Sequence, residues 1–363
     1  MIKIAILTPG FITPNSYGFL YPFHKFKKNF NDQKFNFNIY KNHKSVKDSD
    51  YLILDSKYFG LNYWRKNKKN LGISIIKNLS KKTNQIIYYD NSDSTGWIHE
   101  FVLPYVHKYA KSQLLKNKDL YSNEIYNNRI YCDFYYRKFN ISNTKKSFSV
   151  KINKIERQKF RLGWNSGYAN YNYFGNVLMK MNRYLNIQKI YEKKIKFIDK
   201  NIIDKKNYFF LRMGLTYEHQ TIIFHRNLIL DYFKNNLSYK NFPSKKINRS
   251  NYFRELANSL ISVSPFGLGE ITLKDFESFI SGSILFKPNM NHMETFPNIY
   301  KDNISAVFFD WNTINLEEKI DLILSDLEFS KSLISNSQKM YNHYMNTEEG
   351  SFEFIENFKK ILN

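Results

Sequence analysis

The sequence is organised around short apolar runs, each followed at once by small or polar residues. The first half contains three of them: Ile2–Leu7 before Thr8-Pro9-Gly10, Tyr51–Leu54 before Asp55, and Ile86–Tyr89 before the loop Asp90–Ser94. Such runs are typical of strands buried on both faces of a parallel sheet. A helical spacing of apolar residues in Ile73–Leu79 separates the second run from the third. Strands that alternate with helices predict a doubly wound α/β sheet, whose ligands bind at the carboxyl ends of the strands.

Towards the middle of the chain the pattern becomes less regular. Val102–Tyr121 has a helical pattern broken near Pro104, and the Asn-, Ser- and Lys-rich stretch Asn140–Arg157 predicts a loop. Phe160–Leu162 predicts a late strand that enters a turn containing Gly163. A helix is expected over Phe174–Leu185, and we expect the domain boundary between this late strand and about residue 205.

The alternation of strands and helices then restarts. The expected strands are Tyr208–Leu211, Ile261–Val263, Ser283–Phe286 and Ala306–Phe309. The expected helices are Thr221–Phe233, Asn251–Leu260, Ile271–Ile280, Leu316–Leu327, Leu333–Tyr344 and Phe352–Ile361. The sequence therefore predicts an α/β protein with two Rossmann-like doubly wound domains and a cleft between them. We expect domains at residues 1–185 and 205–345, and a C-terminal helix in 346–363 that packs back on the first domain.

The chain carries a large positive charge. Its 55 Lys and Arg residues against 32 Asp and Glu give a formal net charge of +23. Such an excess favours anionic partners, namely nucleic acid, an acidic membrane surface or a phosphorylated substrate. The abundance of Lys, Asn, Ile, Phe and Tyr, which AT-rich codons encode, offers a compositional explanation for part of it. The basic stretches, such as Arg65–Lys69 and Lys193–Lys196, are scattered along the chain, which is typical of solvated surface.

Other features of the composition restrict the class of protein. With 42% hydrophobic and 18% aromatic residues, the 363-residue chain has enough apolar material for two cores and is not disordered. Cys132 is the single cysteine, so it is expected to be a small packed side chain without a disulfide. No signal-peptide pattern and no run of about 20 apolar residues is present. The sequence favours a cytoplasmic protein.

Ser264–Pro288 is the segment that carries most chemistry. Gly267 and Gly269 allow the backbone to turn sharply and to approach a ligand closely. The helix that follows offers free N–H groups and a positive dipole end to phosphate oxygens. Glu277, further along that helix, is placed to accept hydrogen bonds from the hydroxyls of a ribose. Gly282 then permits a tight turn from the helix into a strand.

The whole segment resembles the donor-binding motif of GT-B glycosyltransferases, particularly the bacterial surface-polysaccharide (group 1) and exostosin-like transferases. The motif of these enzymes is approximately Ser-Pro-x-Gly-x-Gly-Glu, then an acidic helix, then Ala or Ser-Gly and a strand. The resemblance covers most of the second half and includes further residues on both sides: Lys287-Pro288, His292, Glu294, Thr295, Pro297 and Tyr300 downstream, and Arg212-Met213-Gly214, Arg226 and Trp164-Asn165 upstream.

The resemblance implies an enzyme that transfers a sugar from a nucleotide-sugar donor to a glycan or lipid-linked glycan acceptor of the cell surface, such as lipopolysaccharide or capsule. The first domain then faces the acceptor and the second binds the donor. Gly267 and Gly269 would contact the donor, Glu277 its ribose, and Glu270 its sugar or phosphates. The two glutamates are seven residues apart instead of the usual eight, which affects the role of Glu270 more than that of Glu277. No cofactor is expected, because the nucleotide-sugar is a substrate.

The remaining candidates follow from the chemistry of transfer. Arg212, at the end of a predicted strand, is suited to bind and neutralise the leaving diphosphate, although a surface ion pair would also explain it. Lys287 is a second donor-binding candidate, and His292 could contact sugar or phosphate. For a general base the candidates are Asp93 and His24, from loops of the first half. Metal-independent catalysis is expected, because no zinc pattern and no strand-terminal Asp-x-Asp is found.

Two alternatives remain open at this stage. A nucleic-acid-binding protein would explain the charge and the aromatic residues, but no reading module or clustered basic stripe is visible, so no nucleic acid is expected as a partner. A nucleotide-sugar epimerase would keep the fold and the donor site while changing the reaction. The charge also agrees with an enzyme held at the inner face of an anionic membrane.

Overall fold

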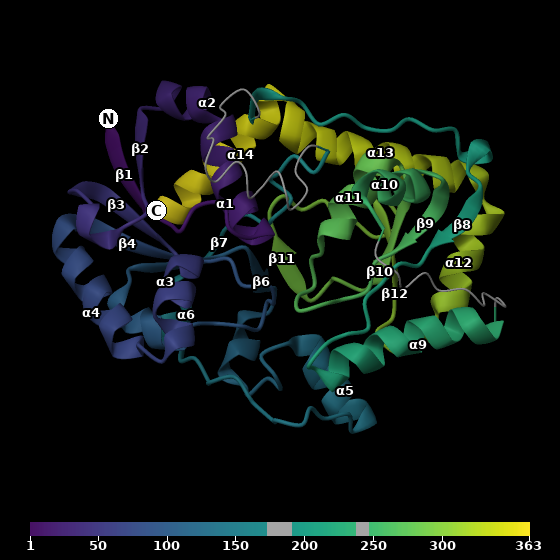
Figure 1. The fold of residues 1–363 in the computed structure, drawn as a ribbon, viewed down its shortest axis with the longest axis horizontal. Helices are drawn as coiled ribbons and strands as arrows, with labels where there is room; N and C mark the ends of the chain where they lie inside the picture. The colour runs from purple at the N-terminus through teal and green to yellow at the C-terminus, as the bar shows by residue number, and fades with distance from the viewer. Residues whose placement is uncertain (173–190, 237–246) are drawn as a thin grey trace.

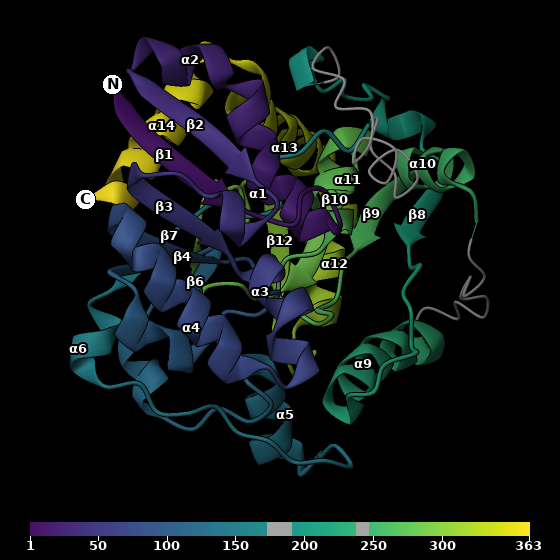
Figure 2. The ribbon, with the colours of Figure 1, turned by 60° about the vertical axis from the view of Figure 1, so that its left-hand side comes forward.

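The computed structural model describes residues 1–172, 191–236 and 247–363, and contains two parallel β-sheets that lie side by side, each with its own helices (Figures 1 and 2). The first half of the chain builds one sheet and the second half builds the other. A doubly wound first sheet and a second parallel sheet with helices on both faces confirm the predicted class of two Rossmann-like α/β domains. The helix predicted at 174–185 and the end of the first predicted domain lie outside the described residues.

The first sheet has six parallel strands in the order β2-β1-β3-β4-β5-β7. Their bounds are β1 Ile2–Leu7, β2 Phe35–Tyr40, β3 Ser49–Asp55, β4 Thr83–Asp90, β5 Lys108–Lys111 and β7 Phe160–Leu162. The order reverses between β1 and β3, and such a switch point opens a crevice at the carboxyl ends of the strands.

Alternate side chains of the first sheet face two different helical layers. Ile4 and Ile6 belong to the core under α1 (Pro14–Lys25), α2 (Lys27–Asp32) and the C-terminal helix. Ala5 and Leu7 belong to the core on the opposite face. That face is covered by α3 (Ser56–Asn62), α4 (Lys69–Leu79) and 3-10 turns that include Trp64–Lys66, Ser80–Lys82 and Glu100–Tyr105. Burial on both faces is the reason that these strands read as apolar runs.

The second sheet has four parallel strands in the order β12-β10-β9-β8. Their bounds are β8 Asn207–Phe210, β9 Ser259–Val263, β10 Ile284–Pro288 and β12 Ala306–Phe309. The accompanying helices are α9 Gln220–Asn236, α10 Arg249–Ala257, α11 Leu273–Ser281, α12 Leu316–Ser325 and α13 Leu327–Asn346. Gly282 ends α11 at a left-handed φ of 66°, which confirms the tight turn predicted there.

The two halves are joined by shared strands and a shared core. β6 (Gln113–Leu115) of the first half pairs antiparallel with β11 (Met293–Thr295) of the second. The C-terminal helix α14 (Glu348–Leu362) lies against α2 and β7 of the first half (Figure 1). Its Phe354 and Phe358 pack on aromatic side chains of that half, among them Trp164. One hydrophobic core therefore runs from the first sheet to α11 of the second half.

Several predicted elements were wrong or missed. Val102–Tyr121 was predicted as a helix, but it forms 3-10 turns at Glu100–Tyr105 and Lys118–Ser122 with β5 and β6 between them. The apolar side chains of this segment fit a helical spacing, but every residue of β5 and β6 is buried, as in a strand covered on both faces. α1, β2, α5 (Ile130–Phe139), α6 (Lys154–Arg157) and β11 were not predicted. Cys132 is fully buried on α5, as expected.

Candidate functional site at the carboxyl ends of the strands

The carboxyl ends of β8 and β9 carry the positive charges of the candidate site. Arg226 projects from α9 and is 6% exposed. Its guanidinium donates to the main-chain oxygens of Phe266 (2.9 Å) and Gly214 (2.5 Å) and lies over the ring of Tyr217. Across the described ranges no carboxylate forms an ion pair with it. A buried arginine held only by neutral groups is a strong attractor for an anion.

Lys274, in the first turn of α11, is the second cation of this cluster. Its ammonium donates to the main-chain oxygens of Arg212 and, at 3.1 Å, of Val263. Burial and the nearby charge of Arg226 lower the pKa of Lys274 to about 7. Sequence reasoning missed Lys274, because one lysine in a helix is ordinary and only the fold brings it to the ends of two strands.

Arg212 lies where the sequence placed it, just beyond β8, but its guanidinium is engaged. It pairs with Glu255 of α10, with distances of 2.9 Å from Nε to each carboxylate oxygen and 2.7 Å from Nη2. In this structure Arg212 therefore forms an ion pair, which is the alternative to phosphate binding that the sequence left open. Its main-chain oxygen nevertheless holds Lys274 in the cluster.

Glu277 lies in the second turn of α11, with its side chain 10% exposed. Its carboxylate accepts from Arg249 at 3.2 Å and also interacts with the hydroxyl of Tyr252. Burial raises the pKa of Glu277, and Arg249 and Tyr252 act in the opposite direction. Arg249 also donates to the main-chain oxygen of Tyr171, and it is a second residue that sequence reasoning missed.

The start of α11 is partly occupied by the chain itself. Asp275 accepts from the main-chain nitrogen of Thr272 (3.0 Å) and from the hydroxyl of Ser264 (2.6 Å). Lys287 is 0% exposed and forms an ion pair of 3.1 Å with the same carboxylate. The structure thus places Lys287 in the interior of the second domain, fully buried. Its part is to neutralise a buried acid, contrary to the donor-binding role expected for it.

Gly267 and Gly269 have different surroundings. At Gly267 a Cβ would lie 3.3 Å from the hydroxyl of Tyr217 and 3.4 Å from Nη2 of Arg226, so the loop faces the cationic cluster. At Gly269 a Cβ would lie 1.7 Å from the carbonyl oxygen of Asp93. Gly269 is therefore required for contact with the first domain, whereas the sequence suggested contact with a ligand.

Glu270 is fully buried at the junction of the two halves. It accepts from the nitrogen and hydroxyl of Thr95 at 3.1 and 2.6 Å, from Gln113 at 3.3 Å, and lies 3.4 Å from Nε2 of His292. Burial raises its pKa, but His292 and Thr95 outweigh this effect and leave the pKa of Glu270 below its usual value. In this arrangement Glu270 joins the domains and contacts no open space.

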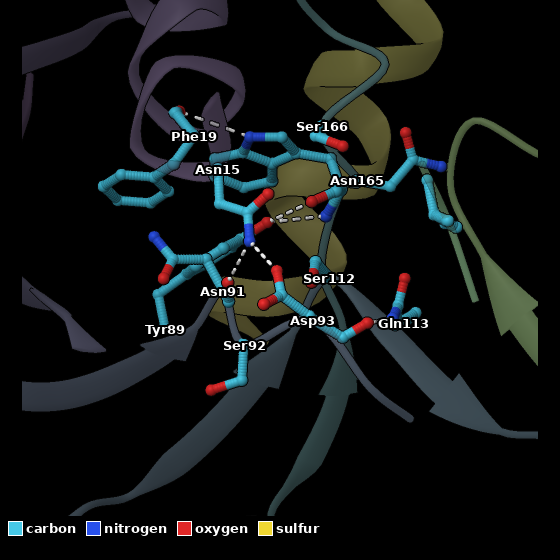
Figure 3. A pocket seen from close by; sticks show the side chains of 12 residues that line it. Asn15, Phe19, Tyr89, Asn91, Ser92, Asp93, Ser112, Gln113, Asn165 and Ser166 are labelled. Atoms are coloured by element: carbon cyan, nitrogen blue, oxygen red, sulfur yellow. Dashed lines mark hydrogen bonds between the residues drawn. The ribbon is translucent and has the colours of Figure 1, made fainter. Parts of the chain in front are cut away.

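Asp93 lies on the loop after β4 of the first half, against the Gly267–Gly269 loop of the second half. Its carboxylate accepts from Nδ2 of Asn15 at 2.5 Å, and the same nitrogen reaches the oxygen of Asn91 (Figure 3). Asp93 and Asn15 line a cavity of about 20 Å³ together with Trp164, Ser166 and others. That volume holds about one water molecule, so nothing much larger than water fits between these residues in the present conformation.

His24 is not brought to this place. It lies at the far end of α1 from Asn15, about 14 Å along the helix axis at 1.5 Å per residue. Its ring stacks on Tyr191 at 4.6 Å, and burial with the nearby Lys27 lowers its pKa to about 4. His24 therefore has the surroundings of a packed aromatic residue, and Asp93 is the better placed of the two base candidates.

The described residues contain neither a membrane-spanning helix nor a metal-binding group of side chains. None of their helices combines the length and the apolar character needed to span a bilayer. Within the same ranges, no three His, Cys, Asp or Glu side chains are grouped in a way that could hold a metal ion.

Comparison with known proteins gave only distant structural likenesses. No family model and no curated protein matches the sequence. A glycosyltransferase from Rickettsia africae aligns with 100% of this chain and 99% of its own, at 10% identity and a TM-score of 0.44. Anabaena HepE in complex with UDP-glucose aligns with 99% and 100%, at 9% identity and a TM-score of 0.45. Sucrose-phosphate synthase from Thermosynechococcus elongatus aligns with 100% and 99%, at 11% identity and a TM-score of 0.42. At such scores these likenesses assign no activity to the chain.

Proposed function

We propose that this protein is a glycosyltransferase that takes a sugar from a nucleotide-sugar donor. The observation that carries the proposal is that Arg226 and Lys274 lie together beside the Gly267 loop. Among the described residues Arg226 has no carboxylate partner. Glu277 lies one turn beyond Lys274 on α11. A diphosphate needs the cations, and the ribose beside it needs a carboxylate at about that spacing. All these groups lie at the carboxyl ends of parallel strands, where α/β sheets bind ligands.

In the proposed reaction the bond between the anomeric carbon and the diphosphate breaks, and negative charge grows on the leaving phosphate. Arg226 and Lys274 stabilise that charge, and Arg212 joins them if ligand binding loosens its pair with Glu255. Asp93 faces the donor loop from the acceptor side and would remove the proton of an attacking hydroxyl in an inverting reaction. Closure of the two halves over the donor would exclude water from the site.

Donor binding is tested by calorimetric titration with UDP and with GDP. One of the two is expected to bind saturably, and Arg226→Gln is expected to weaken it by roughly tenfold to a hundredfold, because a charge-assisted hydrogen bond contributes about 1.5–3 kcal/mol. Arg254→Gln, on the exposed side of α10, is the matched control and should change nothing. Equal binding by wild type and Arg226→Gln, or binding to neither nucleotide, would refute the proposal.

Product analysis distinguishes transfer from epimerisation. With a panel of UDP- and GDP-sugars, a transferase releases nucleoside diphosphate in an acceptor-dependent manner. An epimerase converts one nucleotide-sugar into another without an acceptor. We expect the first outcome and expect it to persist in EDTA, since the two cations can replace a metal ion at the leaving phosphate. Loss of activity in EDTA with recovery in manganese would contradict metal independence.

We further propose that the acceptor is a cell-surface glycan or its lipid-linked precursor, and that the enzyme works at the cytoplasmic face of an anionic membrane. Residues 56–89, which include α3 and α4, contain eight Lys or Arg and no Asp or Glu. Basic residues near an anionic leaflet contribute about 1 kcal/mol each, and salt weakens the attraction. Co-sedimentation with phosphatidylglycerol vesicles should therefore occur at low salt and fade at high salt, and its absence at low salt would refute the membrane contact.

A further inference from the structure

Two adjoining hollows open at the same carboxyl edge of the second sheet, just beyond the ends of β10 and β12. The larger, of about 430 Å³, is lined by residues of α5 and by Trp311. The smaller, of about 270 Å³, is lined by Asn289, His292 and the loop Asp310–Asn312. Phe134 and Trp311 belong to both, so the hollows form one groove, which we call the Trp311 groove. Its total size is in the range of small-molecule sites.

The aromatic floor of the Trp311 groove is held firmly. Nε1 of Trp311 donates to the oxygen of Asn289 at 2.8 Å, and its main-chain oxygen accepts from the hydroxyl of Tyr135 at 2.6 Å. Phe134 meets the Trp311 ring edge-on at a centroid distance of 5.4 Å, and His292 meets it at 5.1 Å. A large ring fixed in this way binds a ligand without paying much conformational entropy.

Several polar groups on the rim of the groove have no protein partner among the described residues, although the amide oxygens of Asn289 and Asn312 accept from main-chain nitrogens. In the part of the chain that the structure describes, the Asp310 carboxylate has no ion-pair partner, and the amide nitrogens of Asn289 and Asn312 donate to no protein group. Nδ1 of His292 is buried and has no hydrogen-bond partner. These groups offer both donors and acceptors around a flat apolar ring. Hydroxyl groups, which both donate and accept, match such a rim.

We propose that the Trp311 groove binds a neutral saccharide unit of the acceptor, with one face of the sugar ring on Trp311 and its hydroxyls on Asp310, Asn289 and Asn312. The free carboxylate disfavours a phosphate or any acidic sugar. The cations at the larger hollow are already occupied, because Arg137 pairs with Asp133 at 2.6 Å and Lys138 lies over Phe134 at 5.3 Å.

The groove is also connected to the proposed reaction site. His292 lines the groove, and its Nε2 lies 3.4 Å from Oε1 of Glu270. Glu270 follows the loop that faces the cationic cluster. A glycan chain in the groove would thus lead to the donor loop. The description of the saccharide as an acceptor rests on the proposed transferase function, whereas its binding does not.

The experiment uses a printed array of neutral oligosaccharides together with their sulfated and sialylated counterparts, probed with the labelled full-length protein. Binding to at least one neutral glycan, with weaker binding to its acidic counterparts, is expected. The strongest neutral binder is then titrated by calorimetry without nucleotide. Absence of binding to every neutral glycan, or a preference for the acidic ones, would overturn the proposal, as would competition by peptides but not by sugars.

Variants locate the site. Trp311→Ala should weaken binding of the selected neutral glycan by at least about tenfold, as truncation of a central aromatic contact does. Asp310→Asn, at an exposed position, should weaken it about threefold to tenfold. Phe352→Ala on α14 and Asp321→Asn on α12, both remote from the groove, are the matched controls. Unchanged affinity in folded Trp311→Ala and in Asp310→Asn would overturn the assignment of the groove.

Titration with UDP keeps this test separate from the proposed function. Both groove variants should bind UDP like the wild type, and Arg226→Gln should bind the neutral glycan like the wild type. Loss of glycan binding in Arg226→Gln would overturn the groove as a distinct subsite. Failure of the wild type to bind either UDP or GDP while it binds the glycan would refute the transferase and leave the groove standing.

Discussion

The carboxyl ends of the two sheets contrast sharply in charge and in how their polar groups are satisfied. At the first sheet, Asp90 pairs with Lys111 at 3.0 Å, both side chains being 0% exposed. Beside it, Asp55 accepts from Thr8 at 2.7 Å and from Asn91 at 2.9 Å, and burial raises the pKa of Asp55 to about 6. At the second sheet, the buried guanidinium of Arg226 is held by main-chain oxygens alone.

The contrast indicates a division of labour between two edges of similar topology. The acids of the first edge are fully partnered by their own chain, so they stabilise the domain and position the Asp93 loop. At the second edge, Arg226 and Lys274 form no ion pair within the part of the chain that the structure describes, so an anionic ligand gains most there. The four predictions below test this division, starting with the largest effect.

Asp90→Ala should destabilise the protein strongly and leave the donor site intact. Removing one partner of a buried ion pair costs about 3–5 kcal/mol, because the charge of Lys111 remains buried. Urea unfolding measures the loss, and Asp321→Ala on the surface of α12 is the control.

Burial raises the pKa of Asp90, but Lys111 and His99 outweigh this effect and hold the pKa below its usual value. The contribution is therefore lost only as the pH falls below about 4, where the unfolded chain binds the proton. A large loss of UDP affinity without a loss of stability would contradict this division, because it would give Asp90 a role in donor binding.

Gly269→Ala should disrupt the contact between the two domains while leaving the donor-binding residues in place. Its new Cβ would lie 1.7 Å from the carbonyl oxygen of Asp93, so the closed contact between the domains cannot form. We expect transfer to fall about a hundredfold, as small displacements of reacting groups do, with a much smaller change in UDP binding. Gly60→Ala is the control, since nothing lies within 4 Å of its added Cβ. Equal turnover in both variants would show that the contact of Gly269 with Asp93 is not part of the active conformation.

Glu277→Ala should weaken UDP binding by about 1.5–3 kcal/mol, the contribution of hydrogen bonds to a charged group. Circular dichroism checks that the variant is folded, and Glu317→Ala on α12 controls for the loss of a surface acid. Calorimetry with UDP and with inorganic pyrophosphate refines the test. The loss should appear with UDP and not with pyrophosphate, which has no ribose. An equal loss with both would assign Glu277 to the shape of the cluster through Arg249.

The titration of Lys274 should make donor binding dependent on pH. Because the pKa of Lys274 lies at about 7 in the free protein, its charge is present below that pH and lost above it. UDP affinity should therefore fall roughly tenfold between about pH 6.5 and about pH 8.5. Lys274→Met should bind more weakly and keep only the dependence due to the phosphate itself. An identical pH profile in the two proteins would remove Lys274 from the site.

The sequence by itself determined most of the strands and helices of the second half. Apolar runs such as Ile261–Val263 are buried on both faces, and the helices α11, α12 and α13 show their periodicity directly. The Gly267–Gly282 segment was recognisable for the same reason, since each of its features depends on residues close in the chain. The short strands β5 and β6 were not recognised, because they lie within Val102–Tyr121, where the apolar residues also fit a helical spacing.

Only the tertiary structure decided which charged residues are free to act. The sequence singled out Lys287 as a donor-binding candidate and passed over Lys274, yet Lys287 is neutralised inside the domain by Asp275 and Lys274 reaches the ends of two strands. Gly269 and Glu270 meet the first domain because Asp93 and Thr95, some 175 residues earlier in the chain, pack against them. Burial and pairing depend on contacts between distant segments, and a sequence pattern records only contacts between near ones.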